Sequence, residues 1–206
     1  MLVMICLLTT PTRAYEAYQI SPFVHQKQQA LQLKTTKTNA LSASDVCGLA
    51  AQSAEVSYGI KPELLETIAS VESGRWVESA QKRIAWPWTV QANGKGHYYK
   101  TKAEAVAAVK AMQEKGINNI DVGCMQINLK YHGKAFTSIE DALDPEKNVA
   151  YSAEFLKKLN KKNGGNWQKT AMQYHSKNHG KGMIYKNRLE KHYAEYINPE
   201  SNMTLF

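Results

Sequence analysis

Apolar residues recur at helical spacing over most of the chain beyond residue 44. Pro62 and Gly74 suit the first turn and the end of a helix, so the sequence predicts a helix between them. Its apolar face is set by three residues at the spacing i, i+3 and i+4: Leu65, Ile68 and Ala69. The i+7 position on the same face is Glu72. A carboxylate therefore takes the place of a fourth apolar side chain, near the end of the helix.

The same period, together with start and stop residues, predicts further helices in the rest of the chain. They run from Asp45 to Tyr58, from Thr101 to Lys115, from Pro145 to about 163, over about 167–174, and from about Lys181 to Asn198. Val46, Leu49 and Ala50 form the apolar face of the first of these helices.

Two segments depart from helical spacing. Residues from Ala85 to Val90, and again from His97 to Tyr99, are rich in aromatic side chains and flank a turn at Asn93 and Gly94, which predicts a small β-hairpin. Aromatic rings can stack on sugars, but a packed hairpin without a ligand explains the composition equally well. Residues 121–128 show neither period and are predicted to form a loop. The predicted fold class is mainly α, with a small β-hairpin insertion.

The length of 206 residues allows one sizeable domain with a leader and a linker. Residues 1–14 combine a short apolar run with an ending typical of signal-peptide cleavage, although a start truncated upstream would look similar. The run is too short to predict a stable membrane span. Residues 15–43 are polar and predict a linker or flexible arm, followed by a folded domain over 44–198 and a C-terminal tail over 199–206.

The formal net charge of +8 raises the question of an anionic partner. The lysines are scattered over several predicted helices and no nucleic-acid motif accompanies them, so we expect no nucleic-acid partner. An anionic polymer of another kind would suit this charge equally well.

Cys6 falls in the predicted leader, which leaves Cys47 and Cys124 in the rest of the chain. In an exported protein this even pair predicts a disulfide. In a cytosolic protein, two buried free thiols would be the better interpretation.

Glu72 is the main candidate for chemistry. A carboxyl group on an apolar helix face loses water and can then serve as a general acid. The structural alternative is a glutamate paired with Arg75 or with a backbone amide.

Four short segments place this glutamate in a wider pattern. Their residues are Glu72, Ser73 and Gly74; Gly123, Met125, Gln126, Ile127 and Asn128; Gln173, Tyr174, His175, Ser176 and Lys177; and Tyr185, Arg188 and Leu189. In this order they resemble the soluble lytic transglycosylase family, lysozyme-like enzymes that cut bacterial peptidoglycan. The resemblance covers about Asp45 to Tyr196. In the third segment the family usually has Ala-Tyr-Asn-Ala-Gly, so only the tyrosine is kept.

The resemblance implies a lysozyme-like domain over 44–198 that acts on peptidoglycan glycan strands in the periplasm or after secretion. It implies cleavage of the β-1,4 bond between N-acetylmuramic acid and N-acetylglucosamine with a 1,6-anhydro product, and neither metal nor cofactor. Glu72 and Tyr174 would be catalytic, and the residues implied to bind substrate are Ser73, Met125, Gln126, Asn128, His175 and Tyr185.

Two other functions stay open. A hydrolytic muramidase would need a second carboxylate to activate water, and Asp121 is the candidate. A non-catalytic wall-binding module of a secretion or flagellar assembly would use the same groove without turnover.

Overall fold

The computed structural model describes residues 45–199 and 204–206. The helices are α2 Val46–Tyr58, α3 Leu64–Ser73, α4 Lys102–Glu114, α5 Leu129–His132, α6 Ile139–Ala142, α7 Pro145–Lys162, α8 Trp167–His175 and α9 His179–His192, with short helical turns η1 Glu78–Ala80, η2 Gly133–Ala135 and η3 Tyr193–Ile197. The strands are β1 Gly74–Val77, β2 Lys82–Ala85, β3 Thr89–Ala92, β4 Lys95–Tyr98, β5 Ile120–Val122 and β6 Ile127–Asn128. The predicted signal peptide and arm lie outside the described residues. No helix within the described ranges is long and apolar enough to cross a membrane.

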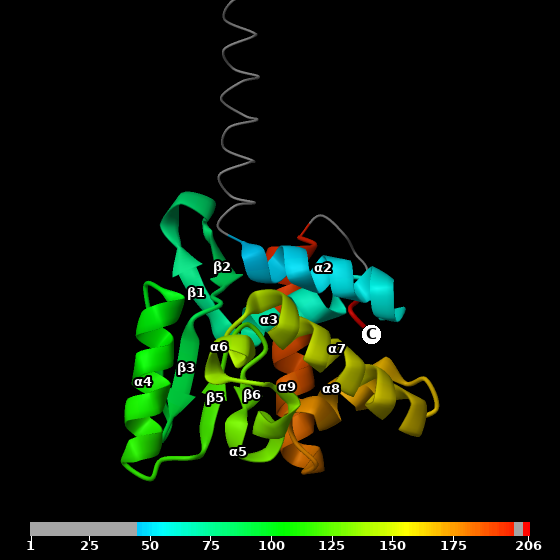
Figure 1. Ribbon diagram of the computed structural model, residues 1–206. Helices are drawn as coiled ribbons and strands as arrows, with labels where there is room; N and C mark the ends of the chain where they lie inside the picture. The colour runs from blue at the N-terminus through cyan, green and yellow to red at the C-terminus, as the bar shows by residue number, and fades with distance from the viewer. Residues whose placement is uncertain (1–44, 200–203) are drawn as a thin grey trace, which may run out of the picture. The chain divides into compact units, whose positions relative to one another are not determined.

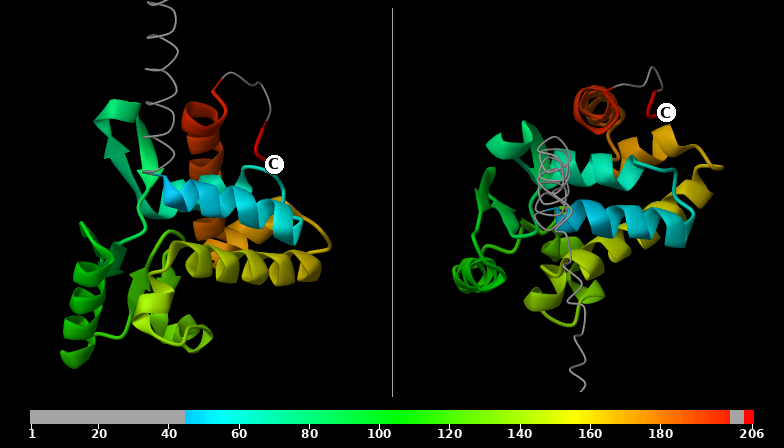
Figure 2. Two further views of the ribbon diagram at one scale, coloured as in Figure 1. Left: turned by 45° about the horizontal axis from the view of Figure 1, so that its top comes forward. Right: turned by 90° about the horizontal axis from the view of Figure 1, so that it is seen from above.

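The larger part of the fold is a group of helices packed around α3. Figure 1 shows α3 behind α2 and α7, with α9 passing beside it, and the left view of Figure 2 shows the strands gathered at the opposite side of the molecule. Leu64, Leu65 and Ile68 of α3 are fully buried in the core that these helices share. Leu205, near the end of the chain, is buried in the same core. The prediction of a mainly α fold is confirmed.

The smaller part is an antiparallel sheet with strand order β4-β3-β5-β6, packed against α4 and α6 over a second apolar core. The hairpin predicted around Asn93 and Gly94 is confirmed, because Ala92 pairs with Lys95 and both turn residues have positive φ. Its first strand begins at Thr89 rather than at Ala85.

Two further pairs of strands were not predicted from the sequence. Residues 121–128 were predicted as a loop, but they form β5, a turn and β6, with Val122 paired to Ile127. These strands are too short to show a period. The ribbon of β1 and β2, which begins where α3 ends, had no recognisable signal either.

The helix that carries Glu72 begins at Leu64, two residues later than Pro62. Its first turn is capped from another helix: the Glu55 carboxylate accepts hydrogen bonds from the backbone N–H groups of Glu63 (2.8 Å), Leu65 (2.6 Å) and Glu66 (3.2 Å). Burial raises the pKa of Glu55, and these three bonds oppose that rise. A side chain of α2 thus supplies the partners that the start of a helix lacks.

Gly74 ends α3, but not by adopting the left-handed conformation that glycine commonly has at the end of a helix. Its φ of −65° is not left-handed, so conformational freedom is not what requires glycine. A Cβ atom there would lie 2.1 Å from the backbone oxygen of Ser70. Glycine is required because strand β1 leaves the helix too closely for any side chain.

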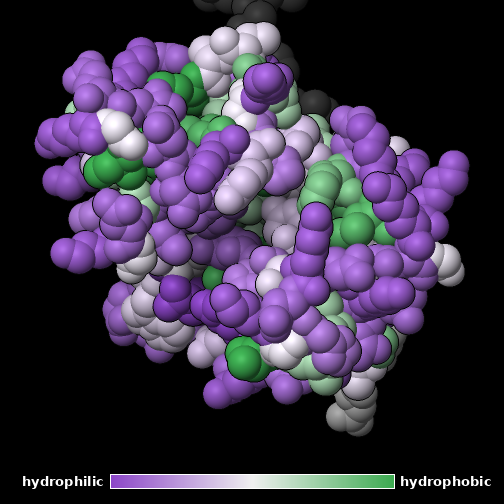
Figure 3. Space-filling model, turned by 90° about the horizontal axis from the view of Figure 1, so that it is seen from below, coloured by the Kyte–Doolittle hydropathy of each residue, from purple (hydrophilic) through white to green (hydrophobic). Residues whose placement is uncertain are grey.

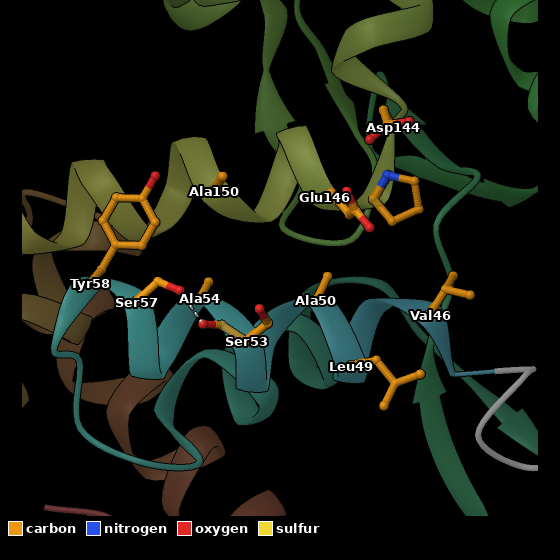
Figure 4. A pocket seen from close by; sticks show the side chains of 11 residues that line it. Val46, Leu49, Ala50, Ser53, Ala54, Ser57, Tyr58, Asp144, Glu146 and Ala150 are labelled. Carbon is orange, nitrogen blue, oxygen red and sulfur yellow. Dashed lines mark hydrogen bonds between the residues drawn. The ribbon is translucent and has the colours of Figure 1, made fainter.

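Two of the three residues expected to form the apolar face of α2 lie on its outer side, whereas the third, Ala50, is half-buried against the core. Val46 and Leu49 keep 37% and 50% of their surface exposed, whereas Cys47, Ala51 and other residues half a turn away are buried. Val46 and Leu49 line a surface groove of about 700 Å³ between α2 and α7 (Figure 4). The prediction was wrong because the small residues that pack closest to α3 carry little hydrophobic signal.

A disulfide joins Cys47 of α2 to Cys124, with 5.6 Å between the Cα atoms. We expect Cys47→Ala combined with Cys124→Ala to lower the free energy of unfolding by about 4 kcal/mol, because the unfolded chain loses a long cross-linked loop. Urea unfolding of the double variant beside the unaltered chain measures this difference. An unchanged unfolding midpoint would contradict it.

His192 is a buried histidine on α9, with Nε2 2.7 Å from Ser70 Oγ. Burial, together with the charges of Arg83 and Arg188, lowers the pKa of His192 to about 4. Between the ordinary histidine pKa and pH 4, His192 is therefore protonated in the unfolded chain but neutral in the folded chain. The free energy of unfolding is unaffected by this difference above pH 7. As the pH falls towards 4, protonation of the unfolded chain lowers the free energy of unfolding by up to roughly 3 kcal/mol.

We expect the free energy of unfolding of the His192→Gln variant to fall less than that of the unaltered chain between pH 7 and 4.5. Urea unfolding at several pH values measures the slope, and His179→Gln, at an exposed histidine on the same helix, is the matched control. Parallel slopes for all three proteins would show that His192 is not the group responsible.

Candidate active site

Glu72 lies in the last turn of α3, on the face whose other members are buried. Its side chain is 17% exposed, and this exposed part lines a groove of about 370 Å³. The rest of the groove is lined by Gln91, Asp121, Gln126, Ile127, Asn128, Tyr131, His132, Tyr174 and His175. Seen from below, the molecule is hollowed near the centre of a mostly hydrophilic face (Figure 3). A partly desolvated carboxyl group thus opens into a polar groove.

The wall that contains Gln126 is built on the turn Gly123–Gln126 between β5 and β6. Ser73, next to Glu72, donates from Oγ to the backbone oxygen of Cys124 (2.8 Å). The Tyr174 hydroxyl donates to the backbone oxygen of Met125 (2.9 Å). The disulfide ties Cys124 itself to α2. Three helices therefore fix the position of this turn relative to Glu72.

Asn148 of α7 holds the same turn from a fourth side. Its Oδ1 accepts from the Met125 N–H (2.9 Å), and its Nδ2 donates to the backbone oxygens of Val122 (3.1 Å) and Ala142 (2.8 Å). Gly123 has φ 81°, and a Cβ atom there would lie 2.4 Å from Asn148 Nδ2. Asn148 was not predicted as a site residue, although an amide beside Val149 on the buried face of a helix was a usable signal.

Gln126 has the left-handed φ of 47°, which costs free energy for a residue other than glycine. Its Nε2 donates to the backbone oxygens of Gly123 (3.0 Å) and Thr89 (3.2 Å). Its buried Oε1 has no hydrogen-bond partner among the described residues. The strain and the unpaired acceptor are both at a residue that faces the groove.

Three residues expected to touch substrate do not reach the groove. Ser73 and Met125 are fully buried, and Tyr185 is 2% exposed. Ser73 and Met125 instead belong to the contacts that fix the turn. The structure corrects these three predictions, because a short sequence motif does not separate the residues that contact a ligand from those that support them.

Gln126, Asn128, Tyr174 and His175 do line the groove. Tyr174 makes no hydrogen bond with Glu72. Its hydroxyl lies between the backbone oxygen of Met125 and Ser152 Oγ (3.3 Å). Burial, and then the negative charge of Glu72, raise the pKa of Tyr174, so its hydroxyl keeps its proton.

His175 stands where the resembled family has asparagine. Its Nδ1 lies 3.7 Å from Glu72 Oε1, and its ring stacks on Tyr185 with 4.3 Å between centroids and 3° between planes. The Tyr185 hydroxyl is buried beside the Glu72 carboxylate: burial, then the negative charge of Glu72 and a hydrogen bond with its carboxylate, raise the pKa of Tyr185. The stack fixes the imidazole beside the carboxylate.

Asp121 is the second carboxylate of the groove. Asn128 Nδ2 donates to its Oδ1 (2.7 Å), and the same amide donates to Asn119 Oδ1 (2.8 Å). Burial raises the pKa of Asp121, the bond from Asn128 opposes this, and the charge of Glu72 adds to the rise. Within residues 45–199 and 204–206, no cluster of three or more acidic, histidine or cysteine side chains could hold a metal ion.

The groove thus combines Glu72, at the end of a buried helix, with a second carboxylate, Asp121, and with amide side chains on the facing wall. The family model of the transglycosylase SLT domain matches residues 50–198, so the chain belongs to that family. Comparison with curated proteins and with solved structures found no match. Membership implies peptidoglycan lysis of the lytic transglycosylase type, outside the cytoplasm, and the disulfide fits that location.

Replacing Asn148 tests its part in fixing the turn. We expect Asn148→Ala to lower the free energy of unfolding by about 2 to 4 kcal/mol, because the Met125 N–H and two backbone oxygens lose their buried partner. Urea unfolding measures the change. Asn187→Ala, at an exposed position of α9, is the matched control, and equal losses in the two variants would contradict the assignment.

Proposed function

We propose that this protein is a lytic transglycosylase that cleaves the β-1,4 bond between N-acetylmuramic acid and N-acetylglucosamine and leaves a 1,6-anhydromuramic end. The observation that carries the proposal is the placement of Glu72, whose carboxyl group opens into a groove faced by Gln126 and Asn128. Membership in the transglycosylase SLT domain family supports the same reaction class.

In this mechanism Glu72 first protonates the glycosidic oxygen, and the departing N-acetylglucosamine leaves as an alcohol. The N-acetyl group of the muramic residue shares the positive charge that develops at its anomeric carbon. Glu72, now a carboxylate, then takes the proton of the muramic C6 hydroxyl, whose oxygen closes the anhydro ring. The proton is returned to the same group, so one carboxylate completes the cycle and no water is consumed.

The remaining groove residues are proposed to hold the sugar. Gln126 lines the groove, and its left-handed backbone together with the two hydrogen bonds of its Nε2 fixes the side chain there. His175 lies within reach of both the groove and Glu72, so we assign it to orienting the carboxyl group and contacting the substrate. Tyr174 acts through Met125 and is a positioning residue.

Glu72→Gln tests the proposed acid. We expect this variant to lose clearing of murein in a zymogram, with a fall in rate of roughly 10³-fold, because an amide cannot transfer the proton. Glu114→Gln, at the exposed end of α4, is the matched control and should clear murein normally. No clearing by either the unaltered chain or the variants would identify a wall-binding module instead.

The presence of Asp121 in the groove favours a hydrolytic muramidase as the second candidate. Mass spectrometry of the murein products separates the two reactions, since hydrolysis leaves reducing ends and the proposed reaction leaves anhydro ends. Asp121→Asn would abolish hydrolysis, whereas the transglycosylase reaction would continue.

A further inference from the structure

Arg75 is a cation fixed close to the candidate acid. It is the second residue of β1, three positions after Glu72, and its guanidinium carbon lies 3.4 Å from the centroid of the Trp86 ring. A guanidinium on an indole face is attracted by the ring and gives up water on one side. Its position is therefore set by stacking rather than by pairing with an acid.

The ring beneath Arg75 is held in place by its own contacts. Trp86 Nε1 donates to the backbone oxygen of Tyr99 (2.7 Å), and the Trp86 backbone N–H donates to the backbone oxygen of Ser73 (3.2 Å). The edge of Trp86 meets Trp88 with 5.4 Å between ring centroids. Because the platform is rigid, the plane of the guanidinium is defined before any ligand arrives.

No carboxylate in the described part of the chain lies within 4 Å of Arg75, although six lysines there make such pairs: Lys102, Lys110, Lys147, Lys158, Lys186 and Lys191. The buried Nε of Arg75 also has no hydrogen-bond acceptor among the described residues. A buried donor without an acceptor lowers the free energy of unfolding, which is unusual for a native structure. The buried Nε atom itself is out of reach of a ligand, but Arg75 as a whole is only half-buried, so an anionic ligand at the rest of the guanidinium would supply the missing charge.

The location of Arg75 limits which anion this is. Arg75 does not itself line the groove around Glu72, but three peptide units keep its Cα atom within about 11 Å of that of Glu72. The muramic residue that Glu72 would cut carries the peptide stem of the wall on its lactyl group, and the stem bears free carboxylates. Arginine is the side chain best suited to a planar carboxylate, because its donors form a fixed fork.

We propose that Arg75, stacked on Trp86, binds a carboxylate of the peptide stem next to the scissile bond. This inference rests on the proposed function, since it takes peptidoglycan as the substrate. Arg75 thereby makes the enzyme prefer glycan strands that carry stems over bare strands.

The test measures binding rather than turnover, in the full chain carrying Glu72→Gln so that the ligand is not cut. The probes are soluble murein fragments of three kinds: with intact stems, with the stem carboxyl groups amidated, and with the stems removed. Into this background we introduce Arg75→Gln, Arg75→Lys or, as the charge-matched control away from Glu72, Lys115→Gln. Isothermal titration calorimetry gives each Kd.

We expect Arg75→Gln to weaken binding of intact fragments about 10-fold and to change binding of the other two kinds by less than about 2-fold. Arg75→Lys keeps a cation on the Trp86 ring, so its Kd for intact fragments should lie between those of the parent and of Arg75→Gln. The Kd of Lys115→Gln should equal that of the parent. Equal losses on all three fragments, or none on intact ones, would overturn the proposal. Failure of the proposed function shows separately, as cleavage that survives Glu72→Gln or as absent cleavage by the unaltered chain.

Discussion

The candidate site depends on one constraint, the fixed position of the turn Gly123–Gln126 opposite the end of α3. Asn148 accepts a hydrogen bond from the Met125 N–H of the turn, Ser73 and Tyr174 donate to two of its carbonyl oxygens, and the disulfide ties it to α2. Each of these partners is buried or half-buried, where an unmade hydrogen bond is expensive. The wall of the groove can therefore not move away from Glu72 without breaking several contacts at once.

The same turn joins the two apolar cores of the protein. Cys124 and Met125 belong to the core shared by the helices, whereas Val122, the residue before Gly123, belongs to the core beneath the sheet. The groove lies where these cores meet, so neither part forms it alone. A polar groove at the junction of two packed parts is a common place for a ligand site, because rigid walls present groups from distant segments.

Part of this site could be predicted from the sequence. Glu72 was found because its position on a helix face follows from a local period, and Gln126, Asn128 and His175 were found by resemblance. Ser73 and Met125 were assigned to the substrate although both are buried. Resemblance identifies the residues that a family keeps. It does not separate the residues that contact substrate from those that hold other parts of the site in place. Asn148 was missed because the three groups that it bonds lie in other segments.

The sequence by itself determined the six longer helices, most of their ends, the β-turn at Asn93 and Gly94, and the turn of α3 that carries Glu72, but not the short helices α5 and α6. These depend on residues a few positions apart, whose spacing is fixed by backbone geometry. Only the tertiary structure decided which face of α2 is buried, that residues 121–128 pair as strands, and that Arg75 rests on Trp86 without a carboxylate. Those outcomes depend on contacts between distant segments, such as Ser73 with Cys124, 51 positions apart, and such pairs meet only when the chain has folded.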